Sequence, residues 1–258
     1  MEMAFVHHCY SEREILQSFA PEPSLTEPNH PHQTLKVDGR AWFMGDLHGC
    51  FSLLREKLAD AGFNPGRGDM LIGVGDLIDR GPDSLACLSL LERPWFRTVL
   101  GNHEAMMLGA LQGSEEEWLR WRRNGGEWFD RLNAEQQQQA RRFLPRLAAL
   151  PLALTVETSR GAHIGVVHAD PGSSDWNDLD ETFCLQHRRT LLWERGRLMG
   201  WQLGGQHPEE VSGIDRVVMG HTPLRDSRWL RLGNLCWLDT GATYNGELTL
   251  VSDLTLLG

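Results

Sequence analysis

Short apolar runs of strand length recur along the chain, and polar sequence containing glycine follows most of them directly. Four or five apolar residues bounded by turn residues are typical of a buried β-strand. The first such runs are AWFM (41–44), MLIGV (70–74), RTVL (97–100), HIGVV (163–167) and RVVM (216–219). Two later runs, LCWLDT (235–240) and ELTLV (247–251), are separated by GATYNG and predict a terminal β-hairpin.

Helical patterns lie between the early strands. Residues 52–62 carry apolar side chains at helical spacing, with Gly62 as an expected C-cap, and residues 83–91 follow Pro82 as a helix follows a first-turn proline. Alternating strands and helices predict a layered α/β domain.

The segment from 114 to 150 has a different pattern, which predicts two or three helices broken at 124–126 and at Pro145. Trp118 and Trp121 lie on one helical face, which favours packing in the core. We interpret residues 113–150 as a helical cap over the sheet. Residues 1–33 are expected to form a loosely ordered extension, because 21–33 is rich in proline and polar residues, and residues 34–258 are expected to form one domain.

Composition limits the function classes. The net charge of −10 over 258 residues argues against a nucleic-acid backbone as the main partner. The N-terminus does not resemble a signal peptide, and no apolar run approaches the roughly 18 residues of a membrane span. An odd number of cysteines without a CxxC pair favours reduced thiols and a cytoplasmic protein.

Residues with metal-ligand chemistry follow five of the expected strands, in GDLHG (45–49), GDLIDRG (75–81), GNHE (101–104), HAD (168–170) and GHT (220–222). One Gly-Asp pair alone does not indicate a metal site, because aspartate and glycine are ordinary turn residues and aspartate often caps a helix N-terminus. In α/β folds, however, the carboxyl ends of strands meet, so residues far apart in sequence can converge there. The candidate ligands are Asp46, His48, Asp76, Asn102, His168 and His221.

This donor set favours two metal ions. Six donors exceed the needs of one tetrahedral ion, whereas two ions about 3.5–4 Å apart can share a carboxylate and leave positions open. Carboxylate, amide and imidazole donors without a thiolate indicate Mn²⁺ first, with iron or Zn²⁺ also suitable.

Asp79, Arg80 and His103 are further candidates beside the ligands. A guanidinium can clamp a phosphate with two hydrogen bonds, and an aspartate can orient a histidine that acts as a general acid. The alternative is that Asp79 and Arg80 form a surface ion pair.

The motifs GDxHG, GDxxDRG and GNHE resemble those of the PPP family of metallophosphatases. Further stretches, including NGGEWF (124–129), LLWERGRL (191–198) and GHTP (220–223), resemble its small bacterial and phage branch, typified by the bacteriophage lambda protein phosphatase. The resemblance covers about Leu35 to Val251. It implies a calcineurin-like metallophosphoesterase sandwich, with central mixed β-sheets flanked by helices and a helical cap segment.

The resemblance also implies roles for the residues. Asp46 and His48 would hold one ion, Asp76 would bridge both, and Asn102, His168 and His221 would hold the second. His103, paired with Asp79, would be the general acid. Arg80 and Arg195 would grip the phosphoryl oxygens, with Arg197 as an alternative to Arg195.

The implied reaction is hydrolysis of a phosphomonoester by direct attack of a metal-bound hydroxide. The implied enzyme is a serine/threonine protein phosphatase, with phosphotyrosine as a further substrate left open, that acts on phosphorylated proteins without an obligatory regulatory subunit. One alternative is a symmetrical bis(5'-nucleosyl)-tetraphosphatase, although such enzymes usually carry alanine at the position of Asp79 and GNHD in place of GNHE. A second alternative is a non-catalytic regulatory module that binds metal and phosphate.

Overall fold

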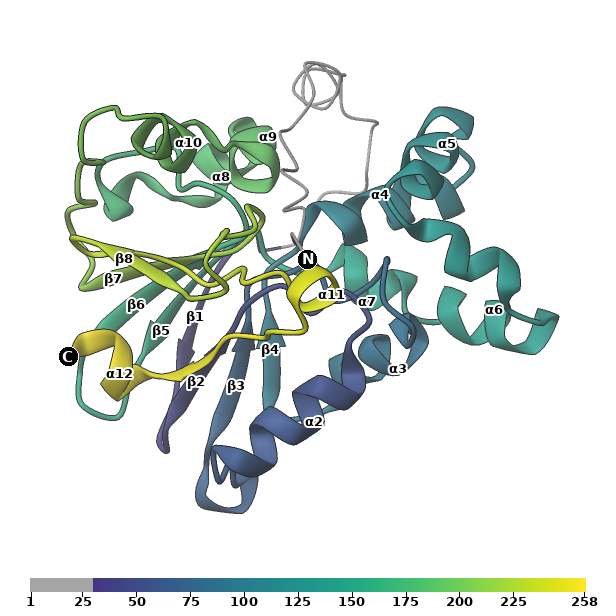
Figure 1. The fold of residues 1–258 in the computed structure, drawn as a ribbon, viewed down its shortest axis with the longest axis horizontal. Helices are drawn as coiled ribbons and strands as arrows, with labels where there is room; N and C mark the ends of the chain where they lie inside the picture. The colour runs from purple at the N-terminus through teal and green to yellow at the C-terminus, as the bar shows by residue number, and fades with distance from the viewer. Residues whose placement is uncertain (1–29) are drawn as a thin grey trace, which may run out of the picture.

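The computed structural model of the chain describes residues 30–258, so nearly all of the expected extension (1–33) lies outside the described residues. The described part contains two mixed β-sheets flanked by helices (Figure 1). One sheet has six strands in the order β1-β5-β6-β7-β9-β8, and the other has four in the order β10-β2-β3-β4. The predicted α/β class with mixed sheets is confirmed.

In the four-stranded sheet, β2, β3 and β4 are parallel and β10 pairs antiparallel with β2. These strands are β2 (Ala41–Met44), β3 (Met70–Gly73), β4 (Phe96–Thr98) and β10 (Leu250–Ser252). In the six-stranded sheet, β5 is antiparallel to β6 and β8 is antiparallel to β9, whereas the other pairs are parallel. Its strands are β1 (His32–Lys36), β5 (Ala153–Glu157), β6 (His163–Val167), β7 (Arg216–Met219), β8 (Leu230–Leu232) and β9 (Leu235–Trp237).

The predicted terminal hairpin is wrong. Strand β9 pairs with β7 and β8, whereas β10 crosses to the other sheet and pairs with β2. The residues between them form the short helix α11 (Ala242–Asn245), flanked by Gly241 and Gly246 at φ 76° and 69°. This helical connection stands where a hairpin loop was expected, and it carries the chain from one sheet to the other.

The start of the sheet also differs from the expectation. Strand β1 begins at His32 and pairs in parallel with β5, so the last residues of the expected extension belong to the six-stranded sheet. The His32 side chain accounts for this earlier start, because its ring nitrogens contact the Leu179 carbonyl and the Thr155 hydroxyl.

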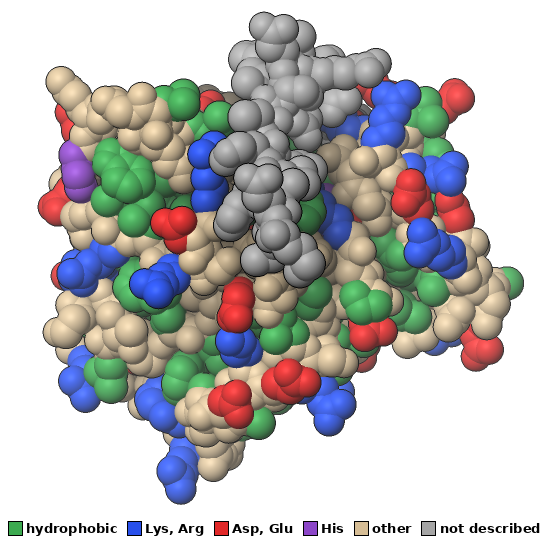
Figure 2. All heavy atoms as spheres, in the orientation of Figure 1, with side chains coloured by type: hydrophobic (Ala, Val, Ile, Leu, Met, Phe, Trp, Pro, Cys, Tyr) green, Lys and Arg blue, Asp and Glu red, His purple; other side chains and the backbone are tan. Residues whose placement is uncertain are grey.

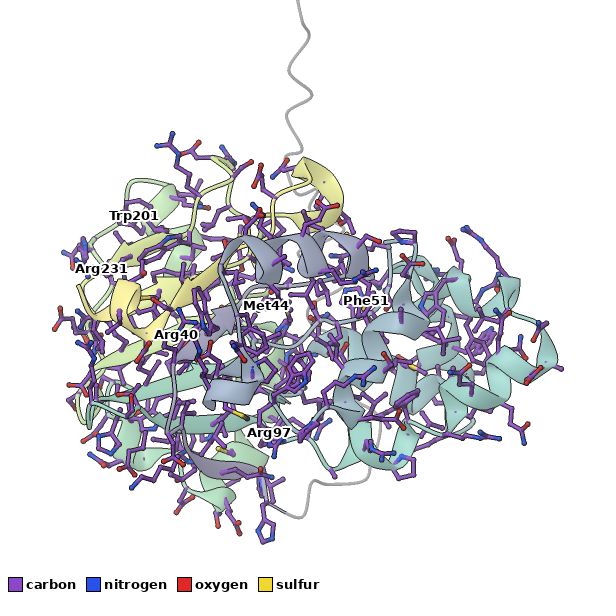
Figure 3. The ribbon with its side chains drawn as sticks, turned by 90° about the horizontal axis from the view of Figure 1, so that it is seen from below. Arg40, Met44, Phe51, Arg97, Trp201 and Arg231 are labelled. Carbon is purple, nitrogen blue, oxygen red and sulfur yellow. The ribbon has the colours of Figure 1, made fainter. Side chains whose placement is uncertain are left out.

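The two sheets pack face to face, and alternate residues of each strand point to opposite sides. In β2, Ala41 and Phe43 belong to the core between the sheets, whereas Trp42 and Met44 belong to the core beneath the helices. In β7, Val218 faces the other sheet, and its neighbours face the helices. Seen from below, Met44 lies near the middle of the molecule (Figure 3).

Helices cover the outer faces of the sheets (Figure 1). Those before residue 112 are α2 (Phe51–Asp60), α3 (Ser84–Leu88) and α4 (Asn102–Leu111). The segment expected to be a cap contains α5 (Glu115–Arg123), the 3₁₀ turn η3 (Gly126–Arg131), α6 (Ala134–Arg141) and α7 (Leu144–Ala148). The later helices are α8 (Glu181–Gln186), α9 (Arg188–Trp193), α10 (Gly196–Gln202) and α12 (Asp253–Leu257). The remaining 3₁₀ turns are η1 (Pro65–Arg67), η2 (Ser89–Glu92) and η4 (Trp176–Asp178).

Over residues 30–258, none of the helices combines the length and apolarity needed to cross a membrane. On the face drawn in Figure 2, the acidic and basic side chains of the described residues are interspersed.

Replacing Phe43 with alanine is expected to lower the free energy of unfolding by about 3–5 kcal/mol, because this fully buried side chain fills the core between the sheets. Urea denaturation monitored by circular dichroism measures the change. The control is Leu203→Ala, because Leu203 is 83% exposed and its loss should change stability by no more than about 0.5 kcal/mol. Equal losses in both variants would mean that the sheets do not pack through Phe43.

Candidate metal centre

The five motif loops lie just after β2, β3, β4, β6 and β7, at the carboxyl ends of these strands. The structure brings their polar side chains together, although they are up to 175 residues apart in sequence. All six candidate ligands are buried: Asp46, His48, Asp76, Asn102, His168 and His221.

One group of donor atoms surrounds a common point. His168 Nε2 lies 2.8 Å from Asn102 Oδ1, 3.1 Å from His221 Nδ1 and 3.4 Å from Asp76 Oδ1. His221 Nδ1 and Asn102 Oδ1 are 3.0 Å apart. With metal–ligand bonds of about 2.0–2.2 Å, ligand atoms around one ion lie about 2.8–3.6 Å apart. The spacing of these atoms therefore fits one divalent ion.

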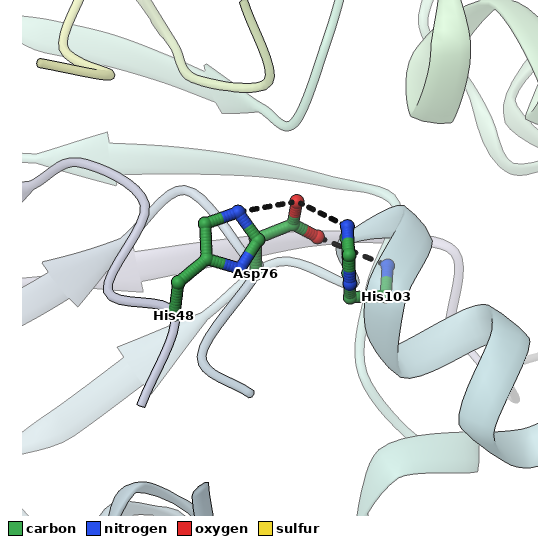
Figure 4. Close-up of side chains that lie close together, drawn as sticks. All are labelled: His48, Asp76 and His103. Carbon is green, nitrogen blue, oxygen red and sulfur yellow. Dashed lines mark hydrogen bonds and ion pairs between the residues drawn. The ribbon is translucent and has the colours of Figure 1, made fainter. Parts of the chain in front are cut away.

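A second group shares Asp76 through its other oxygen (Figure 4). Asp76 Oδ2 lies 3.6 Å from His48 Nε2 and 3.8 Å from His103 Nε2. The carboxylate thus presents Oδ1 to the first group and Oδ2 to the second. Such a carboxylate can bridge two ions.

Asp46 is tied to the same centre through the backbone of the last motif loop. The His221 N–H lies 3.1 Å from each of the two carboxylate oxygens of Asp46. Gly220 makes this contact possible, because a Cβ at position 220 would lie 2.0 Å from Asp46 Oδ1.

Three histidines are oriented by backbone carbonyls. His48 Nδ1 donates to Ile78 O at 2.9 Å, His168 Nδ1 to Val74 O at 2.7 Å, and His221 Nε2 to Trp193 O at 3.2 Å. Because the far nitrogen carries the proton in each ring, the lone pair of the near nitrogen faces the centre. Burial also lowers the pKa of all three imidazoles, that of His168 to about 4, so they are neutral at pH 7.

The backbone of the centre is strained. Within the described residues, six non-glycine residues have positive φ, and five of them belong to the motif loops. These five are His48, Asp76, Asp79, Arg80 and His221, with φ from 44° to 75°. A non-glycine residue in this region costs about 1–3 kcal/mol, and such residues cluster at functional sites.

Glu104 organises two of the loops, and we did not predict this role. Its carboxylate accepts the N–H groups of Asp76 and Leu77 at 2.8 Å and that of Gly101 at 3.1 Å. It therefore holds the loop after β3 against the start of α4. The signal in the sequence is the glutamate at the third position of that helix, where such a side chain reaches back to the N-terminus.

The His103–Asp79 pair lies fully inside the protein. His103 Nδ1 and Asp79 Oδ2 are 2.7 Å apart, and Asp79 is 0% exposed. This burial excludes a surface ion pair between Asp79 and Arg80. The Asp79 carboxylate also accepts the indole N–H groups of Trp121 at 2.8 Å and Trp128 at 2.6 Å. The sequence indicated packing for Trp121, and the structure adds this polar contact.

Arg80 is an exposed residue at the rim of the buried centre. Its Nη1 donates to His48 Nε2 at 2.7 Å, and its guanidinium lies 5.7 Å from the centre of the Tyr244 ring. Arg195 lies at the start of α10, and after burial its positive charge is the largest influence that lowers the pKa of His221. Arg197 instead donates from Nε to Asp170 at 2.9 Å.

The centre contains more carboxyl groups than the motifs alone predict. Burial raises the pKa of Asp76 and Glu104 to about 7 and that of Asp239 to about 6. Burial, followed by the charge of Asp239, raises the pKa of Asp46. Asp239 directly follows the apolar residues at the end of β9, which is the one signal that could have identified it. Several buried carboxyl groups this close together favour bound cations.

Residues 39–244 match the family model described as calcineurin-like phosphoesterase. The chain therefore belongs to this family of phosphoesterases, and the predicted family and enzyme class are confirmed. Among its relatives is serine/threonine-protein phosphatase 1 of Salmonella typhimurium, 42% identical over 228 residues, which are 88% of this chain and 98% of that protein. Serine/threonine-protein phosphatase 2 of Salmonella typhimurium is 36% identical over 213 residues, which are 81% of this chain and 90% of that protein.

Two further matches are partial or distant. A symmetrical bis(5'-nucleosyl)-tetraphosphatase of Shewanella sp. (strain MR-4) is 50% identical over 74 residues, which are 28% of this chain and 26% of that protein. A crystal structure provisionally assigned as a diadenosine tetraphosphatase has a TM-score of 0.57 and 23% identity, and the match covers 87% of this chain and 94% of that chain. The structural match supports the fold.

Mn²⁺ is expected to raise the melting temperature more at about pH 8 than at about pH 6. Asp76, Glu104 and Asp239 have raised pKa values in the folded state, so their contribution to stability is lost as the pH rises through about 6–7. The contribution of His168, whose pKa is lowered to about 4, has the opposite sign: it is fully present above the ordinary pKa of about 6.5 and is lost as the pH falls from there toward 4. Differential scanning calorimetry with and without Mn²⁺ measures the difference.

The control for this measurement is Asp253→Asn, which removes a buried carboxyl group of α12 outside the centre. The effect of Mn²⁺ in this variant should depend on pH as in the unmodified protein. A shift that is the same at both pH values would contradict the role given to the carboxyl groups.

Proposed function

We propose that the protein is a serine/threonine protein phosphatase that uses two divalent ions, with Mn²⁺ as the expected metal. The observation that carries this proposal is the buried hydrogen bond between His103 Nδ1 and Asp79 Oδ2 beside the donor cluster. This pair provides a proton donor for a poor leaving group such as the alkoxide of serine or threonine. The similarity to phosphatase 1 over 98% of that relative supports the same function.

The proposed ligand sets follow the two groups of donor atoms. Asn102, His168 and His221 would hold one ion, Asp46 and His48 the other, and Asp76 both. Bound there, two divalent ions would lower the pKa of water and neutralise charge on the phosphoryl group. The hydrogen bonds of His48, His168 and His221 to backbone carbonyls would fix each imidazole for this role.

His103 is proposed as the general acid and not as a ligand. The three proposed histidine ligands donate to neutral carbonyls, whereas His103 donates to a carboxylate. Burial, followed by the charge of Arg80, lowers the pKa of His103 as burial does for the other three histidines. What distinguishes His103 is its carboxylate partner, which favours the protonated ring and so opposes this shift. His103 Nε2 would transfer that proton to the oxygen of the departing serine or threonine.

Arg80 and Arg195 are proposed to bind the phosphoryl oxygens. Arg80 is exposed at the rim, and its guanidinium can form two parallel hydrogen bonds to a phosphate. Arg195 is preferred to Arg197, because its positive charge acts on His221 and Asp76 of the centre, whereas the Arg197 side chain binds Asp170 and the Glu209 carbonyl.

The proposed substrates are phosphorylated proteins, and the proposed location is the cytoplasm. The four cysteines in the described part of the chain are free thiols, which fits a reducing compartment. We further propose one metallophosphatase domain with the helices of 113–150 as its cap, after an N-terminal extension.

A phosphoserine peptide is expected to be hydrolysed faster than diadenosine tetraphosphate in the presence of Mn²⁺. The reason is that Asp79 and His103 can protonate an alkoxide, whereas a departing nucleotide phosphate needs no such proton. Phosphate release and nucleotide chromatography measure the two rates. Faster turnover of the dinucleotide would instead support a symmetrical tetraphosphatase, the alternative suggested by the 74-residue match.

Asp76→Asn is expected to lose both metal binding and turnover, because it removes the carboxylate that the two ions would share.

His103→Asn is expected to retain metal and to lose about 100-fold or more in kcat on the phosphoserine peptide, with a much smaller loss on p-nitrophenyl phosphate. Isothermal titration calorimetry and steady-state kinetics measure both properties. The matched control is His163→Asn, an exposed histidine at the start of β6, which should change neither. Unchanged kinetics in both site variants would contradict the proposed centre.

A further inference from the structure

Two tryptophans of the cap reach the carboxylate of Asp79. Trp121 is in α5 and is fully buried, and Trp128 is in η3 and is 9% exposed. The Trp121 Nε1 lies 2.8 Å from Oδ2 and 2.9 Å from Oδ1, and the Trp128 Nε1 lies 2.6 Å from Oδ1. They are 42 and 49 residues from Asp79 in sequence.

The hydrogen bonds from these donors are distributed over both oxygens of the carboxylate. Trp128 holds Oδ1, Trp121 bridges both oxygens, and the remaining contact on Oδ2 goes to His103 Nδ1 at 2.7 Å. A carboxylate without such partners can rotate about its Cβ–Cγ bond, and His103 would then lose its alignment. A buried carboxylate also needs donors that replace water, and an indole N–H can only donate.

The indoles are themselves held by an aromatic cluster. The Trp121 ring lies 6.1 Å from Trp128, 5.7 Å from Phe129 and 5.9 Å from Trp118, measured between ring centres. A Cβ at Gly126 would lie 2.6 Å from the Trp121 ring, so glycine is needed where the chain turns beneath it. The same turn contacts the motif loop, because Arg80 N donates to Gly125 O at 3.2 Å.

We propose that Trp121 and Trp128 are positioning residues that clamp Asp79 in the orientation in which it directs His103. This inference rests on the proposed role of His103 as proton donor. It assigns the helical cap a part in the chemistry, since α5 and η3 supply the donors that fix the proton-donating pair. Movement of α5 or η3 would change proton transfer without displacing any of the six proposed metal ligands.

The test uses Trp121→Phe and Trp128→Phe, which retain an aromatic ring and remove the N–H. Each is expected to lower kcat on a phosphoserine peptide by roughly 10-fold, in line with the loss of a hydrogen bond to a charged group. The loss on p-nitrophenyl phosphate should stay below roughly 2-fold, because nitrophenolate departs without a proton. Trp118→Phe, in the same aromatic cluster, is the matched control and should behave as the unmodified protein on both substrates. Equal losses on both substrates would overturn the clamp and leave a purely structural role.

A second measurement does not depend on activity. In protein labelled with ¹⁵N-tryptophan, the indole signals of Trp121 and Trp128, assigned from the two variants, are expected to shift in Asp79→Asn, whereas the Trp118 signal should stay in place. Unshifted Trp121 and Trp128 signals would overturn the clamp. If the unmodified protein hydrolyses neither ester, the proposed function fails, and the indole shifts alone then decide whether Asp79 is clamped.

Discussion

The centre depends on the orientation of one carboxylate. Asp76 faces His168 with one oxygen and His48 with the other, so a small rotation would disrupt both groups of donor atoms. Its backbone is held at φ 51° by Glu104, which accepts the Asp76 N–H and also binds Gly101 at the beginning of α4. Glu104 therefore joins two neighbouring loops and fixes Asp76 relative to the start of α4, where Asn102 lies.

The fold could be predicted where an apolar run of strand length is followed directly by glycine. Residues 41–44 and 216–219 form strands with the expected bounds, because their side chains are buried on both faces. The partner of a strand was harder to predict. The runs at 235–240 and 247–251 are close in sequence, but tertiary packing places them in different sheets. Strand β1 begins with polar residues, and its short pattern gives no periodic signal.

The residues of the candidate site also differ in whether the sequence alone identifies them. The motif residues were identifiable because their side-chain chemistry and their position after a strand are both visible in the sequence. The roles of Trp121 and Trp128 were not, since their contribution depends on which polar atoms they reach in space. The position of Glu104 in the first turn of α4 is visible in the sequence, but its hydrogen bonds to the loop after β3 are not. Trp118 and Trp121 share one helical face, and the fold determines that Trp121 is the one that binds Asp79.

The positive φ angles at His48, Asp76 and His221 have a consequence for how this protein can change. At each of these positions glycine would relieve backbone strain, and it would also remove a donor atom from the centre. Selection for thermal resistance alone would therefore push these positions toward glycine and away from hydrolysis. An inactive descendant of this enzyme could consequently have a higher thermal stability than its parent. Thermal stability by itself would therefore not indicate whether such a protein has kept its activity.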